Sequence, residues 1–317
     1  MVLSCFGFRA SPKDSKNPII PENALRVLFA GWASFVIQDT NNQPRLCGEY
    51  SPEEADLVQA LSAKYADSLR YLNARLPLKL FGWESLQGFL TPRGDVVGLD
   101  RDPTSTVSQS VVHVFYLNAL DVAACGHSMD HLVVVIDAMT RQLHQWTATN
   151  TTPRSVIPCS ESVPSSAATL AHALLLKSVK FERLWAGEGH VLALATDGTL
   201  YSWGSGRHGQ LGHGDLVSEP LPKPIEYLQG IRIVNAACGA AFSVALSEVG
   251  DIYTFGLNDH GQLGIGGFSS VSKLGTEEPR RNTAYPQLVD FYDESGKAID
   301  VNVYGVACGR AHIVVLD

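Results

Sequence analysis

Three glycines in the second half of the chain have the spacing of a phosphate-binding loop. Gly204, Gly206 and Gly209 spell G-x-G-x-x-G, a pattern whose backbone amides hold the pyrophosphate of a dinucleotide. That chemistry needs a strand before the loop and a helix N-terminus after it. Residues 198–203 alternate as a strand does, but the glycines and prolines between 210 and 224 exclude a regular helix. The glycines therefore need another explanation.

A second candidate for chemistry is a metal site. Cys125, His127 and His131 supply ligand types that zinc prefers. The segment reads as a strand, however, and the two histidines would then be more than ~10 Å apart along the backbone. We expect no metal site and no cofactor.

Repetition explains the glycines. When the chain is shifted so that Gly209 meets Gly261, residues 187–212 align with 239–264. The middle glycine of the supposed fingerprint, Gly206, then meets Asn258, which suits a turn but not a backbone in contact with phosphate. We predict positive φ angles at Gly209 and Gly261, buried leucines after them, and glutamine amides bonded to the backbone. The predicted turn residues are Gly198, Gly204, Gly209, Gln210, Leu211 and Gly212 in one copy, and Gly250, Gly256, Gly261, Gln262, Leu263 and Gly264 in the other.

Each copy has the pattern of a small antiparallel sheet. Apolar residues alternate along 242–247, a turn follows near Gly250, and alternation resumes through 252–256. Units of about fifty residues with several strands each are typical of a β-propeller. The sequence predicts an all-β propeller of six blades or an incomplete seven, as a single domain over residues 1–317.

These residues resemble the regulator of chromosome condensation (RCC) repeat. The resemblance rests on the small-residue and histidine strand at 185–190, the aromatic-glycine pair at 203–204 and the Gly-Gln-Leu-Gly turn at 209–212. It implies seven blades. The predicted organisation is clear repeats at about 177–228 and 229–298, a partial repeat at 299–317 closed by residues 2–7, degenerate blades at 25–146 with a helical insert at 51–76, and a linker at 147–169.

The same alignment argues against catalysis. His190 and His312 share one repeat position, and the middle copy places Phe242 there. A position shared by histidine and phenylalanine indicates a packed ring with a satisfied nitrogen rather than a general base. We predict that the protein is not an enzyme.

Departures from the repeat are the candidates for function. The Ser/Thr/Pro-rich segment 147–169 cannot bury much surface and is predicted to be mobile. Its only charge between Arg141 and Glu161 is Arg154, and we predict that a partner orders this segment, with contacts at Pro153, Arg154, Ser155 and Pro158. The alternative is a plain linker between blades. The helical insert at 51–76 either packs on the propeller or forms a docking ridge.

Charge limits the partners. The formal net charge is −8 and no basic block occurs, so strong direct binding of nucleic acid is not expected. No apolar run is long enough to span a membrane.

The layout of the sequence is similar to that of family members that partner a Jumonji-C oxygenase. This resemblance implies an adaptor in histone methylation control, transcriptional repression and chromosome segregation. Such a protein would occur in nucleus and cytoplasm, associated with chromosomes through its partner. The alternative that the family implies is a guanine nucleotide exchange factor for a small GTPase.

Overall fold

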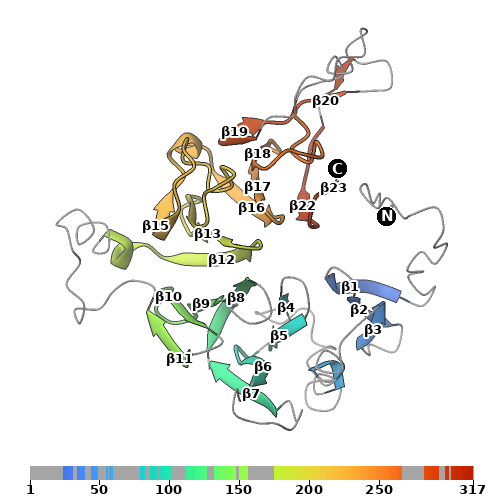
Figure 1. Ribbon diagram of the computed structural model, residues 1–317, viewed down its shortest axis with the longest axis vertical. Helices are drawn as coiled ribbons and strands as arrows, with labels where there is room; N and C mark the ends of the chain where they lie inside the picture. Colours follow the sequence, from blue (N-terminus) through green and yellow to red (C-terminus); the bar gives the residue numbers. More distant parts are fainter. Residues whose placement is uncertain are drawn as a thin grey trace. The chain divides into compact units, whose positions relative to one another are not determined.

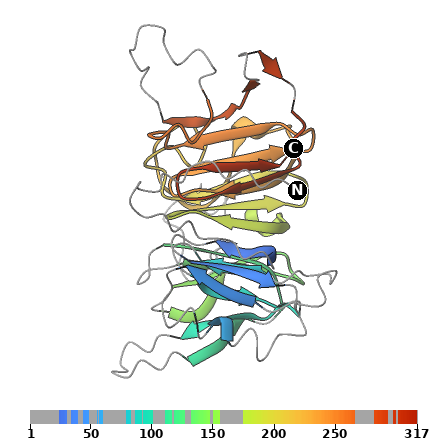
Figure 2. The same cartoon turned by 90° about the vertical axis from the view of Figure 1, so that its right-hand side faces the viewer.

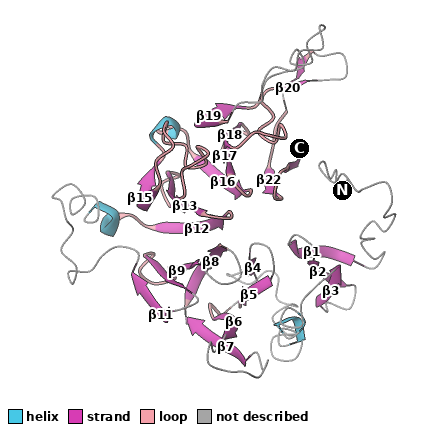
Figure 3. Cartoon of the chain, in the orientation of Figure 1, coloured by secondary structure: helices cyan, strands magenta, loops and turns pink. Residues whose placement is uncertain are grey.

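In the part of the chain that the computed structural model describes, regular secondary structure is almost entirely β-strand (Figures 1 and 3). It divides into two compact units, an N-terminal unit Arg9–Leu184 and a C-terminal unit that begins at Trp185. The structure describes residues 24–30, 34–39, 44–48, 55, 57–59, 79–82, 86–91, 93–100, 111–116, 118–126, 132–147, 150–155, 175–265, 282–292, 297–299 and 301–316. Among the described residues, no helix has the length and apolar character needed to cross a membrane.

Within its described residues, the N-terminal unit forms three antiparallel sheets in which neighbouring strands are consecutive in the sequence. The first is a three-stranded sheet of β1 (Ala24–Ala30), β2 (Ser34–Asp39) and β3 (Pro44–Gly48). The second has four strands, β4 (Lys79–Gly82), β5 (Leu86–Leu90), β6 (Val96–Asp100) and β7 (Val111–Tyr116). The third also has four, β8 (Ala119–Cys125), β9 (Leu132–Asp137), β10 (Leu143–Thr147) and β11 (Asn150–Ser155).

The C-terminal unit carries the repeated sheets (Figure 2 shows the strands from the side). One repeat forms the sheet of β12 (Phe181–Ala186), whose first four residues belong to the N-terminal unit, with β13 (His190–Ala195), β14 (Leu200–Gly204) and β15 (Glu219–Pro224). The short 3-10 helix η1 (Glu226–Leu228) follows. The next forms the sheet of β16 (Ile233–Cys238), β17 (Phe242–Ser247), β18 (Ile252–Gly256) and β19 (Thr283–Leu288). Two hairpins follow, β20 (Phe291–Tyr292) with β21 (Ala298–Ile299) and β22 (Gly305–Cys308) with β23 (Ile313–Leu316).

Neighbouring sheets of the C-terminal unit pack face to face through apolar side chains. Leu192, Leu194 and Leu200 of one sheet share a buried cluster with Ala245 and Phe255 of the next. The central strands β13 and β17 are buried along their whole length. Burial on both faces explains why most residues of these strands are apolar on both faces, with His190, Ser243 and Ser247 as the polar exceptions.

The outermost strands carry proline. Pro153 lies in β11, three prolines lie in β15 and Pro286 lies in β19. Proline cannot donate a ladder hydrogen bond, and an edge strand tolerates this loss. In all three sheets the pairing of the outermost strand shifts register, which accommodates the missing donor. The prolines that exclude a helix at 220–224 are therefore edge-strand residues.

The predicted linker 147–169 is wrong over its first part. Residues 150–155 form β11, which pairs with β10 after a connection of only two residues. The Thr-rich composition reflects the preference of β-branched residues for strands, while the proline is accommodated at a register shift. The third sheet thus extends past residue 146. Residues 156–169 lie outside the described residues.

Two other predictions fall mostly on undescribed residues. Closure of the ring by residues 2–7 lies outside them and stays a prediction. Within the predicted helical insert at 51–76, Ala55 and residues 57–59 are helical, and Leu57 is completely buried. Burial of Leu57 and Val58 indicates that this face packs on the fold. The extent of the helix stays a prediction.

Candidate protein-binding surface

The turn after β14 and the turn after β18 have the same geometry. Gly209 and Gly261 have φ angles of 83° and 76°, as the repeat comparison predicts. The Oε1 atoms of Gln210 and Gln262 accept hydrogen bonds from the backbone N–H groups of His208 and His260, each at 2.9 Å. Leu211 and Leu263 are buried in the core. The other predicted turn glycines, Gly198, Gly204, Gly212, Gly250, Gly256 and Gly264, also have positive φ.

The first turn also supports the neighbouring sheet. The Ser243 hydroxyl on β17 donates to the Gln210 carbonyl at 2.8 Å. A Cβ added to Gly212 would lie 2.9 Å from the Phe255 ring, so this glycine lets the ring of the next sheet pack on the turn. The Gly-Gln-Leu-Gly element therefore joins two blades and is a structural device.

His190 is part of the same junction. Its Nε2 lies 2.9 Å from the Ser243 hydroxyl, and because that hydroxyl donates to Gln210, Nε2–H is the donor. The prediction of a satisfied nitrogen holds for Nε2 only, since Nδ1 is buried without a hydrogen-bond partner. Burial lowers the pKa of His190 to about 4. A neutral, completely buried imidazole cannot exchange protons with a substrate.

Position 258 is less tolerant than the sequence suggests. Asn258 is 3% exposed, and its Oδ1 accepts the Leu263 N–H at 3.1 Å. Gly206, at the matching position, lies against the backbone of Val217, which a Cβ would meet at 2.0 Å. The two residues therefore solve the same packing problem differently and are not interchangeable.

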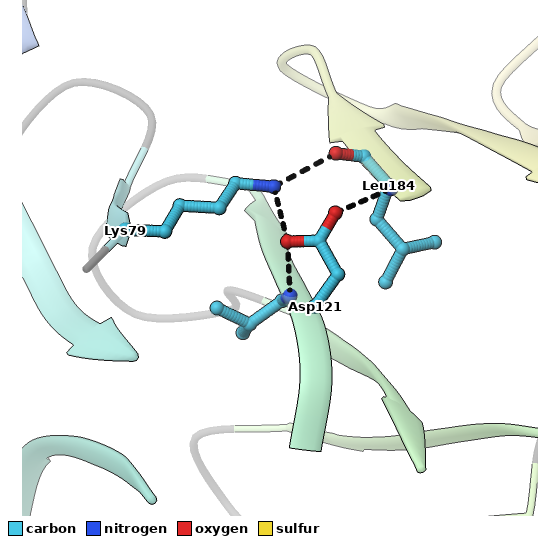
Figure 4. A network of polar contacts seen from close by, with 4 residues as sticks. Lys79, Asp121 and Leu184 are labelled. Carbon is cyan, nitrogen blue, oxygen red and sulfur yellow. Dashed lines mark hydrogen bonds and ion pairs between the residues drawn. The ribbon is translucent and has the colours of Figure 1, made fainter. Parts of the chain in front are cut away.

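The inner strands of the N-terminal unit are joined by an ion pair (Figure 4). Lys79 Nζ on β4 lies 2.6 Å from Asp121 Oδ1 on β8 and donates to the Leu184 carbonyl at 3.0 Å. Asp121 Oδ2 accepts the Leu184 N–H at 2.8 Å, and Oδ1 accepts the Val122 N–H at 2.8 Å. The pair thus binds both the N–H and the carbonyl of Leu184 in β12. Sequence reasoning missed it because the partners are far apart in the chain.

The predicted partner-binding residues lie at the edge of the third sheet. Pro153, Arg154 and Ser155 belong to β11, and Pro158 lies outside the described residues. Arg154 pairs with Gln145 and Ser155 with His144, with a register shift on the other side of Arg154. Within the described residues, β10 is the only strand that pairs with β11. The structure therefore brings three of the four predicted residues together on one edge strand.

A polar cluster that sequence reasoning missed lies next to this edge. The Tyr116 hydroxyl at the end of β7 donates to Asp137 Oδ2 at 3.0 Å, and its ring lies 5.7 Å from that of His144 on β10. Asp137 Oδ1 accepts hydrogen bonds from the backbone of Met139 and from the backbone and hydroxyl of Thr140. The Asp-x-x-Thr spacing is a turn signal available in the sequence, but the contact with Tyr116 is not.

The cluster is built for positioning and not for proton transfer. Burial alone would raise the pKa of Asp137, but its hydrogen bonds from Thr140, Tyr116 and Met139 outweigh burial and lower the pKa. Burial lowers the pKa of His144, with the Asp137 charge opposing the shift. Burial and the Asp137 bond raise the pKa of Tyr116. At neutral pH these groups form a fixed anion, a neutral ring and a neutral phenol.

The repeats match a known family. Residues 197–246 and 249–316 match the model of the regulator of chromosome condensation (RCC1) repeat, and residues 233–262 match a second model of that repeat. The chain is 48% identical over 91 residues to RCC1 domain-containing protein 1 of Mus musculus. This match covers 29% of this chain and 24% of that protein. The Homo sapiens protein of that name is 41% identical over 110 residues, covering 35% of this chain and 29% of the relative.

Solved structures extend the likeness of fold. Prp20p from Saccharomyces cerevisiae matches with a TM-score of 0.58 at 17% identity, covering 92% of this chain and 68% of that chain. Together, the antiparallel sheets and the matched repeats define an RCC1-type β-propeller fold. The match to the RCC1 repeat covers residues 197–246 and 249–316, and the chain spans less than a third of the length of the two RCC1 domain-containing relatives.

Proposed function

We propose that the protein is a non-catalytic adaptor that binds a protein partner through β11 and its neighbouring residues. The observation that carries the proposal is the position of Pro153, Arg154 and Ser155 on one edge strand. A Jumonji-C oxygenase is the partner that the resemblance of the sequence layout implies. The role is then in histone methylation control, transcriptional repression and chromosome segregation, in nucleus and cytoplasm, with attachment to chromosomes through the partner.

The chemistry of the described polar groups supports an adaptor. His190 is fully buried and neutral, and the Asp137 carboxylate is occupied by hydrogen bonds from its own turn and from Tyr116. Gln210, Gln262 and Ser243 bond to the backbone. These polar side chains therefore stabilise the fold, and the surface remains for recognition.

The edge position favours recognition by side chains. An unpaired edge can accept a further strand, but Pro153 and the register shift interrupt the regular array of donors that strand addition needs. The guanidinium group of an arginine is a forked donor that suits a carboxylate or a carbonyl of a partner. Arg154 is therefore the residue that we expect to contribute most to binding.

A pull-down with a purified Jumonji-C oxygenase tests the proposal. Because residues 150–155 form a strand, replacing the whole segment would damage the sheet, so a single charge reversal is the sharper variant. Arg154→Glu should lose retention of the oxygenase, while Arg93→Glu, an exposed arginine of the same unit, should retain it. Equal retention of wild type and Arg154→Glu would contradict the proposed surface, and no retention of the wild type would contradict the partner.

A guanine nucleotide exchange factor is the second candidate function. It is favoured by the fold shared with Prp20p, a protein described for its binding to Gsp1p and histones. An exchange factor accelerates nucleotide release because it binds the nucleotide-free GTPase more tightly. Small GTPases loaded with fluorescent GDP separate the two functions. Accelerated release at sub-stoichiometric protein would favour exchange, and unchanged release across the panel would favour the adaptor.

A further inference from the structure

Four large apolar side chains are exposed on neighbouring segments of the C-terminal unit. Leu216 and Val217, in the connection between β14 and β15, are each 59% exposed, and Tyr227 of η1 and Tyr285 of β19 are 55% and 44% exposed. Clustered exposed aromatics of this kind are typical of sites where another molecule binds. We call these four residues, with the acidic residues Asp215 and Glu226, the tyrosine patch.

Gly214 holds the two tyrosines together. Their ring centroids are 4.8 Å apart with an interplanar angle of 85°, an edge-to-face pair. A Cβ added to Gly214 would lie 2.7 Å from the Tyr285 ring and 2.9 Å from the Tyr227 hydroxyl, so both rings rest on this glycine. The Gly214 N–H also donates to the Ala284 carbonyl at 2.9 Å, which ties the loop to β19.

The backbone on either side of each ring is anchored. Ile225 and Leu228, which flank Tyr227, are 2% and 4% exposed and belong to the core. The Tyr285 backbone is bonded on both sides to the Thr283 hydroxyl, which donates to the Tyr285 carbonyl and accepts from its N–H. The tyrosines are therefore exposed on a fixed frame, so a ligand would not have to pay for ordering them.

The charge of the patch is acidic. Asp215 and Glu226 are exposed, and within the described part of the chain neither has an ion-pair partner, whereas nearby Glu219 is paired with Lys223 at 3.0 Å. Some desolvation, the neighbouring Tyr285 and the charges of Glu226 and Asp215 together raise the pKa of Tyr227. Both carboxylates therefore act on the space around this ring.

We propose that the tyrosine patch binds an arginine-bearing segment of a protein partner. A guanidinium can stack on a tyrosine ring and offer its forked donors to a carboxylate, while its aliphatic stem covers leucine and valine. Lysine supplies the charge but not the planar stacking surface. The site lies on the other unit from β11, and it requires neither the oxygenase nor the proposed role in chromatin.

Peptide binding to the full chain tests this assignment. The probe is a dye-labelled Gly-Arg-Leu-Arg-Gly peptide, compared with versions that carry citrulline or lysine in place of arginine, by fluorescence anisotropy. Citrulline removes the charge at nearly constant shape and should weaken binding about tenfold, as expected for loss of a charge-assisted contact. The double variant Tyr227→Ser/Tyr285→Ser and the double variant Asp215→Asn/Glu226→Gln should each weaken binding about fivefold.

Matched controls separate the patch from general surface effects. Tyr304→Ser removes another exposed tyrosine of the same unit, and Asp259→Asn removes another exposed carboxylate, and both should bind as the wild type does. Equal binding of arginine and citrulline peptides, or equal losses in patch and control variants, would overturn the proposal. Self-association that is abolished by the tyrosine variant would also overturn it, because the occupant would then be a second copy of the chain.

Discussion

Neighbouring blades are joined by different means in the two units of the molecule. In the C-terminal unit, the loop after β14 folds back and supplies the Gln210 carbonyl and the Gly212 backbone to the next sheet. In the third sheet of the N-terminal unit, β10 runs into β11 after two residues, so no such loop exists there. The inner strands of that unit are held instead by the Lys79–Asp121 pair on Leu184.

The difference shows how the outer edge strand of a blade can become available for binding a partner. Where the long loop is present, the Gln210 carbonyl accepts the Ser243 hydroxyl of the neighbouring blade. Where it is absent, the Lys79–Asp121 pair joins the inner strands, and β11 forms the outer edge of its sheet. We therefore expect substitutions in the Gly-Gln-Leu-Gly turns and at the Lys79–Asp121 pair to affect stability, and substitutions on β11 to affect binding.

The largest expected effect comes from filling the turn in the regular repeat. Gly209→Val places a β-branched residue at a φ of 83°, with its Cβ 2.7 Å from both the Ala284 Cα and the Thr283 carbonyl oxygen. We expect a loss of about 3–5 kcal/mol in the free energy of unfolding, from backbone strain and overpacking together. Denaturant unfolding measures it. A loss below that of Asp121→Ala would contradict the central place of this turn.

The next largest effect is expected from the Lys79–Asp121 ion pair and its hydrogen bonds to Leu184. Asp121→Ala leaves the N–H groups of Val122 and Leu184 without their acceptor, which should cost about 2–3 kcal/mol. Lys79→Met removes a charge that is a third exposed. The Asp121 oxygens that accept the Val122 and Leu184 N–H groups remain, so this variant should cost about 1 kcal/mol. Calorimetry of both variants gives the ratio. Equal losses in the two variants would mean that these strands are joined mainly by the charge pairing and not by the hydrogen bonds from the backbone to Asp121.

A smaller effect is expected from acid at His190. Its pKa in the folded protein is about 4, below the ordinary 6.5, because burial disfavours the charged ring. The unfolded chain therefore binds a proton between these values that the folded chain does not, and stability falls as pH is lowered through this window. From pH 6.5 to 5 the loss should be roughly 1.5 kcal/mol.

His190→Phe, which copies Phe242 of the next repeat, should remove this part of the pH dependence. The exposed His260 provides the control, because His260→Gln should leave the slope unchanged. Chemical unfolding at several pH values measures the slope. An unaltered slope in His190→Phe would show that the imidazole is not held neutral.

The sequence predicts the repeated features well, because the Gly-Gln-Leu-Gly turn occurs twice in the chain and the two copies can be compared. The glutamine–backbone bonds, the buried leucines and the positive φ angles all follow from the match of residues 209–212 with 261–264. The strand β11 could not be predicted, because proline and threonine together suit a linker as well as an edge strand. The contacts of Asp121 and of Tyr227 join segments distant in sequence, and neither has a repeated counterpart to reveal it.

The most direct test of the separation between fold and binding is a paired measurement of Kd for the oxygenase and of Tm. Arg154→Glu should weaken binding about tenfold with an unchanged Tm. Gln262→Ala, which leaves the His260 N–H without its acceptor, should lower Tm by a few degrees with an unchanged Kd. The opposite pattern, a lowered Tm in Arg154→Glu with full binding, would contradict the account.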